Sequence, residues 1–150
     1  MSVWAGIDLG TSGIKLALFD DNEHLLAAAS RPIAVSRPRP GWSEQPPDLW
    51  WRAVCSGLDE LAATAPEAMA RLRGIGLSGQ MLGLVLLDEA QRPVRPAILW
   101  NDQRALAECR ELLEKVPDIG RRSHGAPDPG IIGPKMLWLA RHEPAVLESS

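Results

Sequence analysis

Short apolar runs separated by polar turns occupy the first third of the chain. Residues 3–9 and 14–19 are almost wholly apolar, and a third run covers 25–35 after the polar segment 20–23. Runs of this length between turn residues are typical of β-strands, so the pattern predicts a β-meander. Asp8 is the one carboxylate in the first run. If that strand is buried, the carboxylate should be paired, hydrogen-bonded or directed at a cation.

The next segment predicts an extended loop and then a helix. Residues 37–47 hold four prolines and one glycine, which favour an extended loop. Asp48 follows two prolines and is a good helix N-cap, and the helix should end near residues 65–66. Its predicted buried stripe recurs at helical spacing: Trp50, Ala53, Val54, Gly57, Leu58 and Leu61.

The second half predicts a mixture of strands and helices. Residues 74–77 form a short apolar run, 84–88 and 94–99 suggest a strand pair, and Asp102 is positioned to cap a helix. The stripe of that helix would be Leu106, Cys109, Leu113 and Val116. Residues 117–133 lack an apolar period and predict a loop, and Pro134 suits the first position of a closing helix that stops before Pro144. These elements favour an α/β layered domain.

The turn between the first two predicted strands carries candidate chemistry. Gly10 and Gly13 allow a tight turn and close approach of backbone N–H groups to a ligand. Thr11 and Ser12 add hydroxyl groups, and Lys15 adds a positive charge. This set suits a polyphosphate with a metal ion held by Asp8. The spacing matches neither common nucleotide-binding loop, which leaves an alternative open. In this alternative the segment is a hairpin whose Asp and Gly residues only make the turn, and Lys15 is solvated.

Composition excludes some classes of function. The formal net charge is −3 and the isoelectric point is about 5.6, which argue against a nucleic-acid binder. No apolar stretch reaches membrane-spanning length, so no membrane partner is expected. Cys55 and Cys109 lack metal-ligand spacing and are expected to be reduced, which predicts a cytoplasmic protein. His24, His124 and His142 also lack such spacing and are expected to face solvent.

Five blocks of sequence, in order along all 150 residues, resemble the FGGY family of carbohydrate kinases, and in particular its xylulokinase branch. The first is the Asp-Leu-Gly-Thr-Ser-Gly-Ile-Lys segment at residues 8–15. The others are residues 36–45 followed by Trp50-Trp51, then residues 74–81, 95–104 and 134–144. The resemblance implies an actin-like, ribonuclease H-like ATPase fold with a mixed sheet and flanking helices. It also implies that residues 1–150 are an incomplete N-terminal domain, with the rest of that domain and the C-terminal domain absent.

By resemblance, the reaction is ATP-dependent phosphorylation of a pentulose, D-xylulose to D-xylulose 5-phosphate. Asp8 would be catalytic and would assist Mg²⁺, directly or through water, while Gly10, Thr11, Ser12, Gly13 and Lys15 would bind the ATP phosphates. The implied sugar-binding residues are Gln80, Met81, Leu82, Asp102 and Arg104. For Asp102 a helix cap, and for Arg104 a surface charge, remain the alternatives. The implied partners are the sugar and ATP. The full-length form could in addition assemble as a homodimer.

Two departures from the family leave the substrate open. Xylulokinases typically have Met-His-Gly where this chain has Met81-Leu82-Gly83, and leucine cannot hydrogen-bond a sugar hydroxyl. Residues 125–133 lack the aromatic residue and the threonine that the family carries before Pro-Lys-x-Leu-Trp. The alternatives are therefore another ketose or a polyol as substrate, or an inactive truncated binding module. No carboxylate here matches the family's catalytic base, so we expect this chain alone to be inactive.

Overall fold

The computed structural model describes residues 1–123 and 125–150, in two compact units. Unit 1 comprises residues 1–34 and 48–80, and unit 2 comprises residues 35–47 and 81–150. The chain therefore passes from unit 1 to unit 2 and back before it enters unit 2 for the second time.

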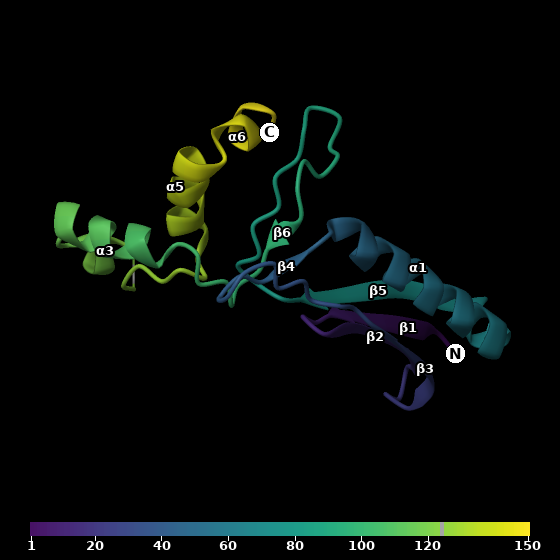
Figure 1. The fold of residues 1–150 in the computed structure, drawn as a ribbon. Coiled ribbons are helices and arrows are strands. Elements are labelled where there is room, and N and C mark those ends of the chain that lie inside the picture. The colour runs from purple at the N-terminus through teal and green to yellow at the C-terminus, as the bar shows by residue number, and fades with distance from the viewer. Residues whose placement is uncertain (124) are drawn as a thin grey trace. The chain divides into compact units, whose positions relative to one another are not determined.

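Unit 1 is a four-stranded mixed sheet with helices. Its strands are β1 (Val3–Leu9), β2 (Gly13–Asp20), β3 (Leu25–Pro32) and β5 (Leu72–Gly79), in the spatial order β3-β2-β1-β5. β2 pairs antiparallel with both β1 and β3, whereas β5 pairs parallel with β1. The connection to β5 contains α1 (Pro47–Thr64) and the short α2 (Pro66–Met69). Figure 1 shows α1 running along this sheet.

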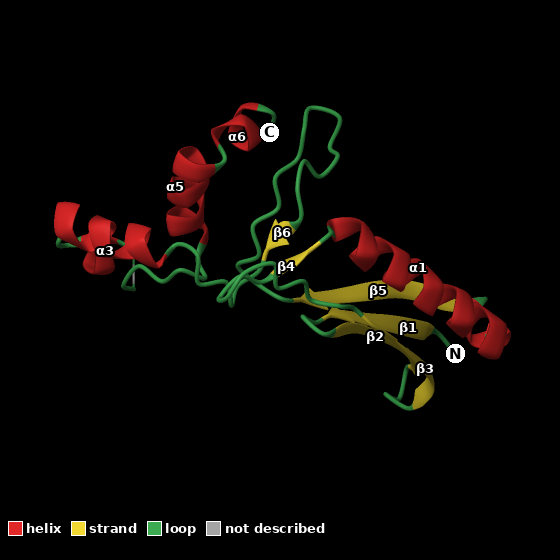
Figure 2. Cartoon of the chain, in the orientation of Figure 1, coloured by secondary structure: helices red, strands yellow, loops and turns green. Residues whose placement is uncertain are grey.

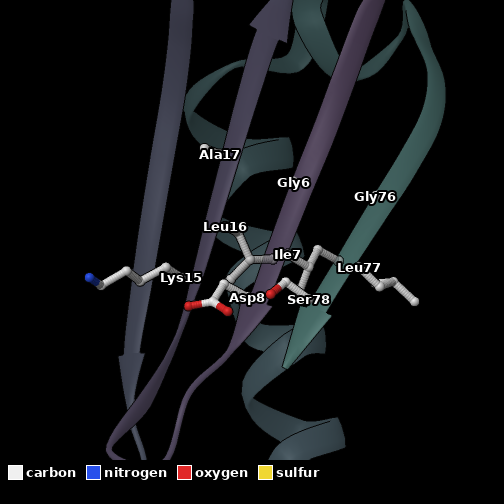
Figure 3. A pocket seen from close by; sticks show the side chains of 9 residues that line it. All are labelled: Gly6, Ile7, Asp8, Lys15, Leu16, Ala17, Gly76, Leu77 and Ser78. Carbon is white, nitrogen blue, oxygen red and sulfur yellow. The ribbon is translucent and has the colours of Figure 1, made fainter. Parts of the chain in front are cut away.

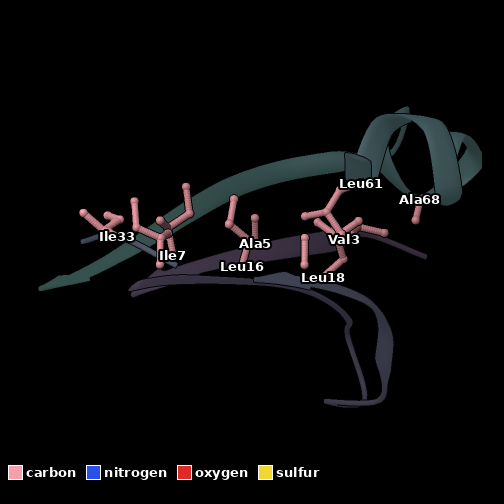
Figure 4. Close-up of a cluster of buried hydrophobic side chains, with 10 residues drawn as sticks. Val3, Ala5, Ile7, Leu16, Leu18, Ile33, Leu61 and Ala68 are labelled. Atoms are coloured by element: carbon pink, nitrogen blue, oxygen red, sulfur yellow. The ribbon is translucent and has the colours of Figure 1, made fainter. Parts of the chain in front are cut away.

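The core of unit 1 lies between the sheet and α1. Alternate residues of β1 and β2 point into it, and Leu61 is the fully buried contribution of α1 (Figure 4). Gly57 lets the helix approach closely, because a Cβ at this position would overlap Leu16 Cδ1. The predicted stripe on α1 is confirmed. The predicted cap is not, because Asp48 lies within the first turn of α1. The inward residues of the two strands are Val3, Ala5, Ile7, Ile14, Leu16 and Leu18.

Unit 2 is built mainly from loops and short helices. Its two short strands, β4 (Glu44–Gln45) and β6 (Ala97–Ile98), pair antiparallel. Its helices are α3 (Leu106–Lys115), α4 (Ile119–Arg122), α5 (Ile132–His142) and α6 (Pro144–Glu148). Trp138 packs edge-on against Trp42 with 5.3 Å between ring centroids. The buried apolar residues around Trp138 are Leu84, Leu86, Ile98, Ala105 and Leu139.

Several predicted elements of unit 2 differ from the structure. Residues 84–88 form no strand: Figure 2 shows the long connection from β5 to β6 as loop, with isolated bridges Leu84–Ile98 and Leu87–Pro93. β6 pairs with β4, which the sequence presents as part of a proline-rich loop. In α3, Cys109 is buried whereas Leu106 and Leu113 are exposed, so the predicted stripe is wrong. The predicted loop 117–133 contains α4, and Pro134 is the third residue of α5.

The histidines that the structure describes are largely exposed at the side chain, at His24 and His142. His124 lies outside the described residues. Within 1–123 and 125–150, no group of three His, Cys, Asp or Glu residues is arranged to hold a metal ion. In the same residues, no helix combines the length and apolar character that crossing a membrane requires.

Candidate functional site

Asp8 is exposed on the sheet face opposite the core of unit 1. β1 is buried on one face only, because its residues alternate: Ile7 points into the core and Asp8 points away from it, so the carboxylate is not buried. Its neighbours across the sheet are Lys15 on β2 and Ser78 on β5. Figure 3 shows these three side chains in a row, with Lys15 pointing away from Asp8. Among the described residues, Asp8 has no ion-pair partner within 4.0 Å.

The row containing Asp8 borders a hollow of about 410 Å³ on this face of the sheet. Its neighbouring row across the sheet is Ala17, Gly6 and Gly76, which have small side chains or none (Figure 3). A Cβ on Gly6 would meet nothing within 4 Å, so the absence of side chains leaves this space open. The charged and hydroxyl groups of the hollow are therefore confined to the row formed by Lys15, Asp8 and Ser78.

The turn after Asp8 is closed by backbone contacts. The N–H of Gly10 donates to the carbonyl of Gly13 at 3.0 Å, and the carbonyl of Ser12 accepts a bond from Ile33 at 3.0 Å. A Cβ on Gly13 would lie 2.6 Å from the carbonyl oxygen of Arg31, so this position requires glycine. The turn is thus pinned against the end of β3, with the side chain of Ser12 exposed.

Thr11 connects this turn to the end of β5. Its Oγ1 donates to Oε1 of Gln80 at 3.0 Å, and the N–H of Gln80 donates to the carbonyl of Leu9 at 2.8 Å. A residue predicted to bind the ATP phosphates, Thr11, is therefore in direct contact with a residue predicted to bind the sugar, Gln80, within unit 1. The two residues are 69 positions apart in sequence.

The chain enters unit 2 at Met81, so the remaining predicted sugar-binding residues are described there. The side chains of Met81 and Leu82 are 77% and 47% exposed. Leu82 has φ = 64°, in the left-handed region that bulky side chains avoid. Its carbonyl accepts a hydrogen bond of 2.8 Å from Lys135 Nζ. A strained, exposed and externally anchored residue of this kind is typical of functional segments.

Asp102 is fully buried and organises a loop. Its Oδ2 accepts from the N–H of Ser43 at 2.6 Å, and its Oδ1 accepts from the backbone N–H and Nε of Arg104, both at 2.9 Å. The predicted helix cap is wrong, because α3 begins at Leu106 and its N-cap position, Ala105, carries no side-chain cap. Asp102 instead fixes the segment around Ser43 relative to the start of the loop before α3.

Arg104 is likewise buried, so the alternative of a surface charge is wrong. Its Nη2 donates to Glu44 at 2.6 Å and to Asp102 at 2.8 Å, and Glu44 also accepts from Arg95 at 2.5 Å. Burial acts to lower the pKa of Arg104, but its hydrogen bonds to Asp102 and Glu44 outweigh this and raise the pKa. Any sugar contact by Arg104 would have to be made from within this network.

Two residues of interest were not singled out from the sequence. Ser78 stands beside Asp8 because β1 and β5 pair in parallel, and the sequence by itself does not fix this register. Lys135 is fully buried at Nζ, and burial lowers its pKa to about 8. No local pattern in the sequence indicates that a lysine at this position is buried, because the carbonyls that it bonds come from other segments.

The fold defines the class of this chain: its mixed sheet with flanking helices is the fold of actin-like sugar kinases, shared over nearly the whole chain by a solved sugar kinase. Residues 3–149 match the model of the N-terminal domain of the FGGY family of carbohydrate kinases. The chain belongs to this family.

Similar proteins agree with the family assignment. Xylulose kinases from Klebsiella pneumoniae and from Escherichia coli (strain K12) are each 42% identical over 144 residues, 96% of this chain and 29% of their own length. The crystal structure of a xylulose kinase from Rhodospirillum rubrum is similar with a TM-score of 0.92 and 34% identity, over 98% of this chain and 30% of that one. The chain thus spans about three tenths of these relatives.

Proposed function

We propose that this chain is the part of a pentulose kinase that carries the Mg²⁺-assisting carboxylate, the ATP-phosphate turn and the first sugar contacts. The favoured reaction is phosphorylation of D-xylulose to D-xylulose 5-phosphate. The observation that carries the proposal is the exposed Asp8 carboxylate next to a turn, Gly10–Gly13, that is fixed by backbone bonds. The family membership and the xylulose kinase relatives support it.

The residues fit the groups that the reaction requires. Mg²⁺ usually keeps several waters and binds through one or two carboxylates plus substrate phosphates, and Asp8 offers such a carboxylate. When bound, the ion would neutralise charge that develops on the phosphates. The turn formed by Gly10, Thr11, Ser12 and Gly13 would place N–H and hydroxyl donors near the phosphates, with Lys15 as a further positive charge.

In the proposed reaction, a sugar hydroxyl oxygen forms a bond to the γ-phosphorus and the bond to the bridging oxygen of ADP breaks. The hydroxyl proton goes to a base. By resemblance to the family, this base is a carboxylate, and no residue of this chain matches it. We therefore propose that residues 1–150 are part of the N-terminal domain and do not turn over substrate alone. Cytoplasmic location and a full-length homodimer stay predictions of the same proposal.

The experiment is a coupled ADP-release assay on the complete native gene product with a panel of ketoses and polyols, in parallel with the 150-residue chain. We expect the complete product to phosphorylate a pentulose in a Mg²⁺-dependent manner and the 150-residue chain to show no turnover. Turnover by the 150-residue chain would contradict the assignment of the base. Nucleotide binding without turnover in the complete product would favour the inactive binding module.

Leu82 favours a second candidate, a kinase for another ketose or for a polyol. An exposed leucine offers no hydrogen bond to a sugar hydroxyl, so a substrate that lacks a hydroxyl at this contact would fit better. The variant Leu82→His distinguishes the two, because histidine is tolerated in the left-handed region and can bond a hydroxyl. If the native substrate lacks that hydroxyl, L82H should lower KM for D-xylulose by roughly threefold to tenfold and should raise KM for the native substrate.

A further inference from the structure

Lys135 is a lysine without access to solvent whose three donors are directed at three carbonyl oxygens. It lies in α5, and its Nζ donates to Gly130 at 2.5 Å, to Leu82 at 2.8 Å and to Ile98 at 3.4 Å. Lysine is almost never fully buried unless it is paired, and an ammonium group carries three donors and no acceptor. One side chain therefore bonds all three of the segments that meet at Lys135.

The contact to Leu82 acts on a strained peptide. At φ = 64° the Cβ of a leucine crowds the following carbonyl oxygen, so this conformation is strained relative to the right-handed region. Such a conformation persists only where the surroundings determine it. Lys135 bonds the carbonyl of this residue, so it opposes relaxation of Leu82 to an ordinary φ.

The contact to Gly130 acts on a second constrained segment. The N–H of Gly130 donates to Oδ1 of Asp128 at 2.7 Å, and a Cβ on Gly130 would overlap the carbonyl oxygen of Trp100. Both the N–H and the carbonyl of Gly130 are thus fixed. Lys135 therefore bonds two constrained segments at once, through the carbonyls of Leu82 and Gly130.

We propose that Lys135 is a positioning residue that holds the sugar-binding corner Met81–Gly83 and the Asp128–Gly130 turn in one fixed arrangement. It acts on sugar binding, because two of the backbone carbonyls that it bonds belong to this corner and this turn. The inference rests on the proposed function, since the corner binds sugar only if the chain serves a sugar kinase.

The test uses the complete native gene product and the variants Lys135→Met, Leu82→Gly and both together. Methionine keeps most of the volume and removes all three donors. We expect K135M to raise KM for the sugar roughly tenfold, the cost of losing charge-assisted hydrogen bonds that fix geometry, with kcat changed less than twofold. Glycine adopts φ = 64° without penalty, so K135M should raise KM less than threefold when Leu82 is already glycine.

A second readout does not depend on the sugar. Amide hydrogen exchange at Leu84 and Gly130 reports the corner and the turn, because both amides are hydrogen-bonded. K135M should speed exchange at both sites at least tenfold, with little change at amides of unit 1. The control Lys115→Met removes an exposed lysine paired with Glu111 and should leave both KM and exchange unchanged. If K135M does not fold, Lys135→Gln, with two donors, gives the same comparison at smaller amplitude.

Equal losses in kcat and 1/KM, or uniform acceleration of exchange over both units, would overturn the positioning role and leave a purely structural lysine. Local acceleration in K135M, in a protein whose wild type phosphorylates no sugar, would refute the proposed function and the role in sugar binding together. In that case the exchange data would still assign the contact between the two segments to Lys135, so the two failures are distinguishable.

Discussion

The guanidinium group of Arg104 lies over the ring of Trp42, with 3.7 Å between its Cζ and the ring centroid. Because Nη2 of the same group bonds Asp102 and Glu44, the arginine is held by an aromatic face and by two carboxylates at once. The Cζ of Arg104 also lies 5.1 Å from the ring centroid of Trp138. This one side chain therefore joins the β4 segment, the loop before α3, and α5.

Removal of Arg104 should strongly destabilise unit 2. Arg104→Met leaves the buried carboxylates of Asp102 and Glu44 without their shared cation, which typically costs about 3–5 kcal/mol. Urea denaturation monitored by tryptophan fluorescence measures the loss. The matched control is Arg92→Met, because Arg92 forms an exposed pair with Asp88 and should cost less than about 1 kcal/mol. Equal effects of the two variants would contradict a dominant role of the buried network.

Asp8→Asn should abolish phosphoryl transfer without unfolding the protein. The exposed carboxylate has no ion-pair partner among the described residues, so its loss should change the free energy of unfolding by less than about 0.5 kcal/mol. The turnover number of the complete product should fall at least about 100-fold. Asp59→Asn, an exposed position on α1, is the control and should retain activity. Full activity in D8N would exclude the proposed role of this carboxylate.

Two glycines close together in sequence should respond to alanine with opposite signs. Gly130→Ala forces a Cβ onto the carbonyl oxygen of Trp100, a backbone atom that cannot turn aside, and should cost about 1–3 kcal/mol. Gly133→Ala places its Cβ in open space within α5 and should stabilise by about 0.4–1 kcal/mol. Thermal denaturation of both variants measures the difference, and a neutral G130A would show that the turn can move.

The stability of unit 2 should increase with pH between about 8 and 10.5. Burial lowers the pKa of Lys135 to about 8 from 10.5, and of the charges that face it, Arg104 lowers it while Asp102 and Asp128 raise it. In this window the unfolded chain holds a proton that the native protein has released, so the free energy of unfolding rises with pH, by up to about 3 kcal/mol.

The pH dependence is measured as a difference. Urea denaturation from pH 7 to 10.5 should show a steeper rise for the wild type than for Lys135→Met, which lacks the titrating group. Burial raises the pKa of Cys109, but this thiol is present in both proteins and its contribution cancels. Parallel curves for wild type and K135M would contradict the lowered pKa of Lys135.

The sheet and α1 could be predicted from the sequence because their signals are local. The apolar run at residues 3–9 became β1 with the same bounds, and the helical stripe on α1 packs as expected. The exposure of Asp8 was missed because a run that is apolar at nearly every position hides its alternation. One face of β1 is covered by α1, and the other carries Trp4, Gly6 and Asp8.

In unit 2 the sequence was less informative because its contacts join distant segments. β4 and β6 are two residues long and pair over a separation of about a third of the chain, so no hydrophobic period marks them. Arg104 and Lys135 are charged residues that local reasoning places at the surface, whereas the carboxylates and carbonyls that bury them come from elsewhere in the chain. Family resemblance pointed to these segments without indicating what the two side chains contact.

The parallel pairing of β1 with β5 sets an order on events during synthesis. β2 follows β1 after a short turn and can form its hairpin as soon as both leave the ribosome. β5 is made roughly 60 residues later, which at typical synthesis rates of about 5–20 residues per second is a delay on the order of 3–12 seconds. During that interval the second edge of β1 has no partner strand. A nascent chain is therefore most open to pairing with a neighbouring copy before residue 72 emerges, and a slow stretch of translation before β5 would lengthen that exposure.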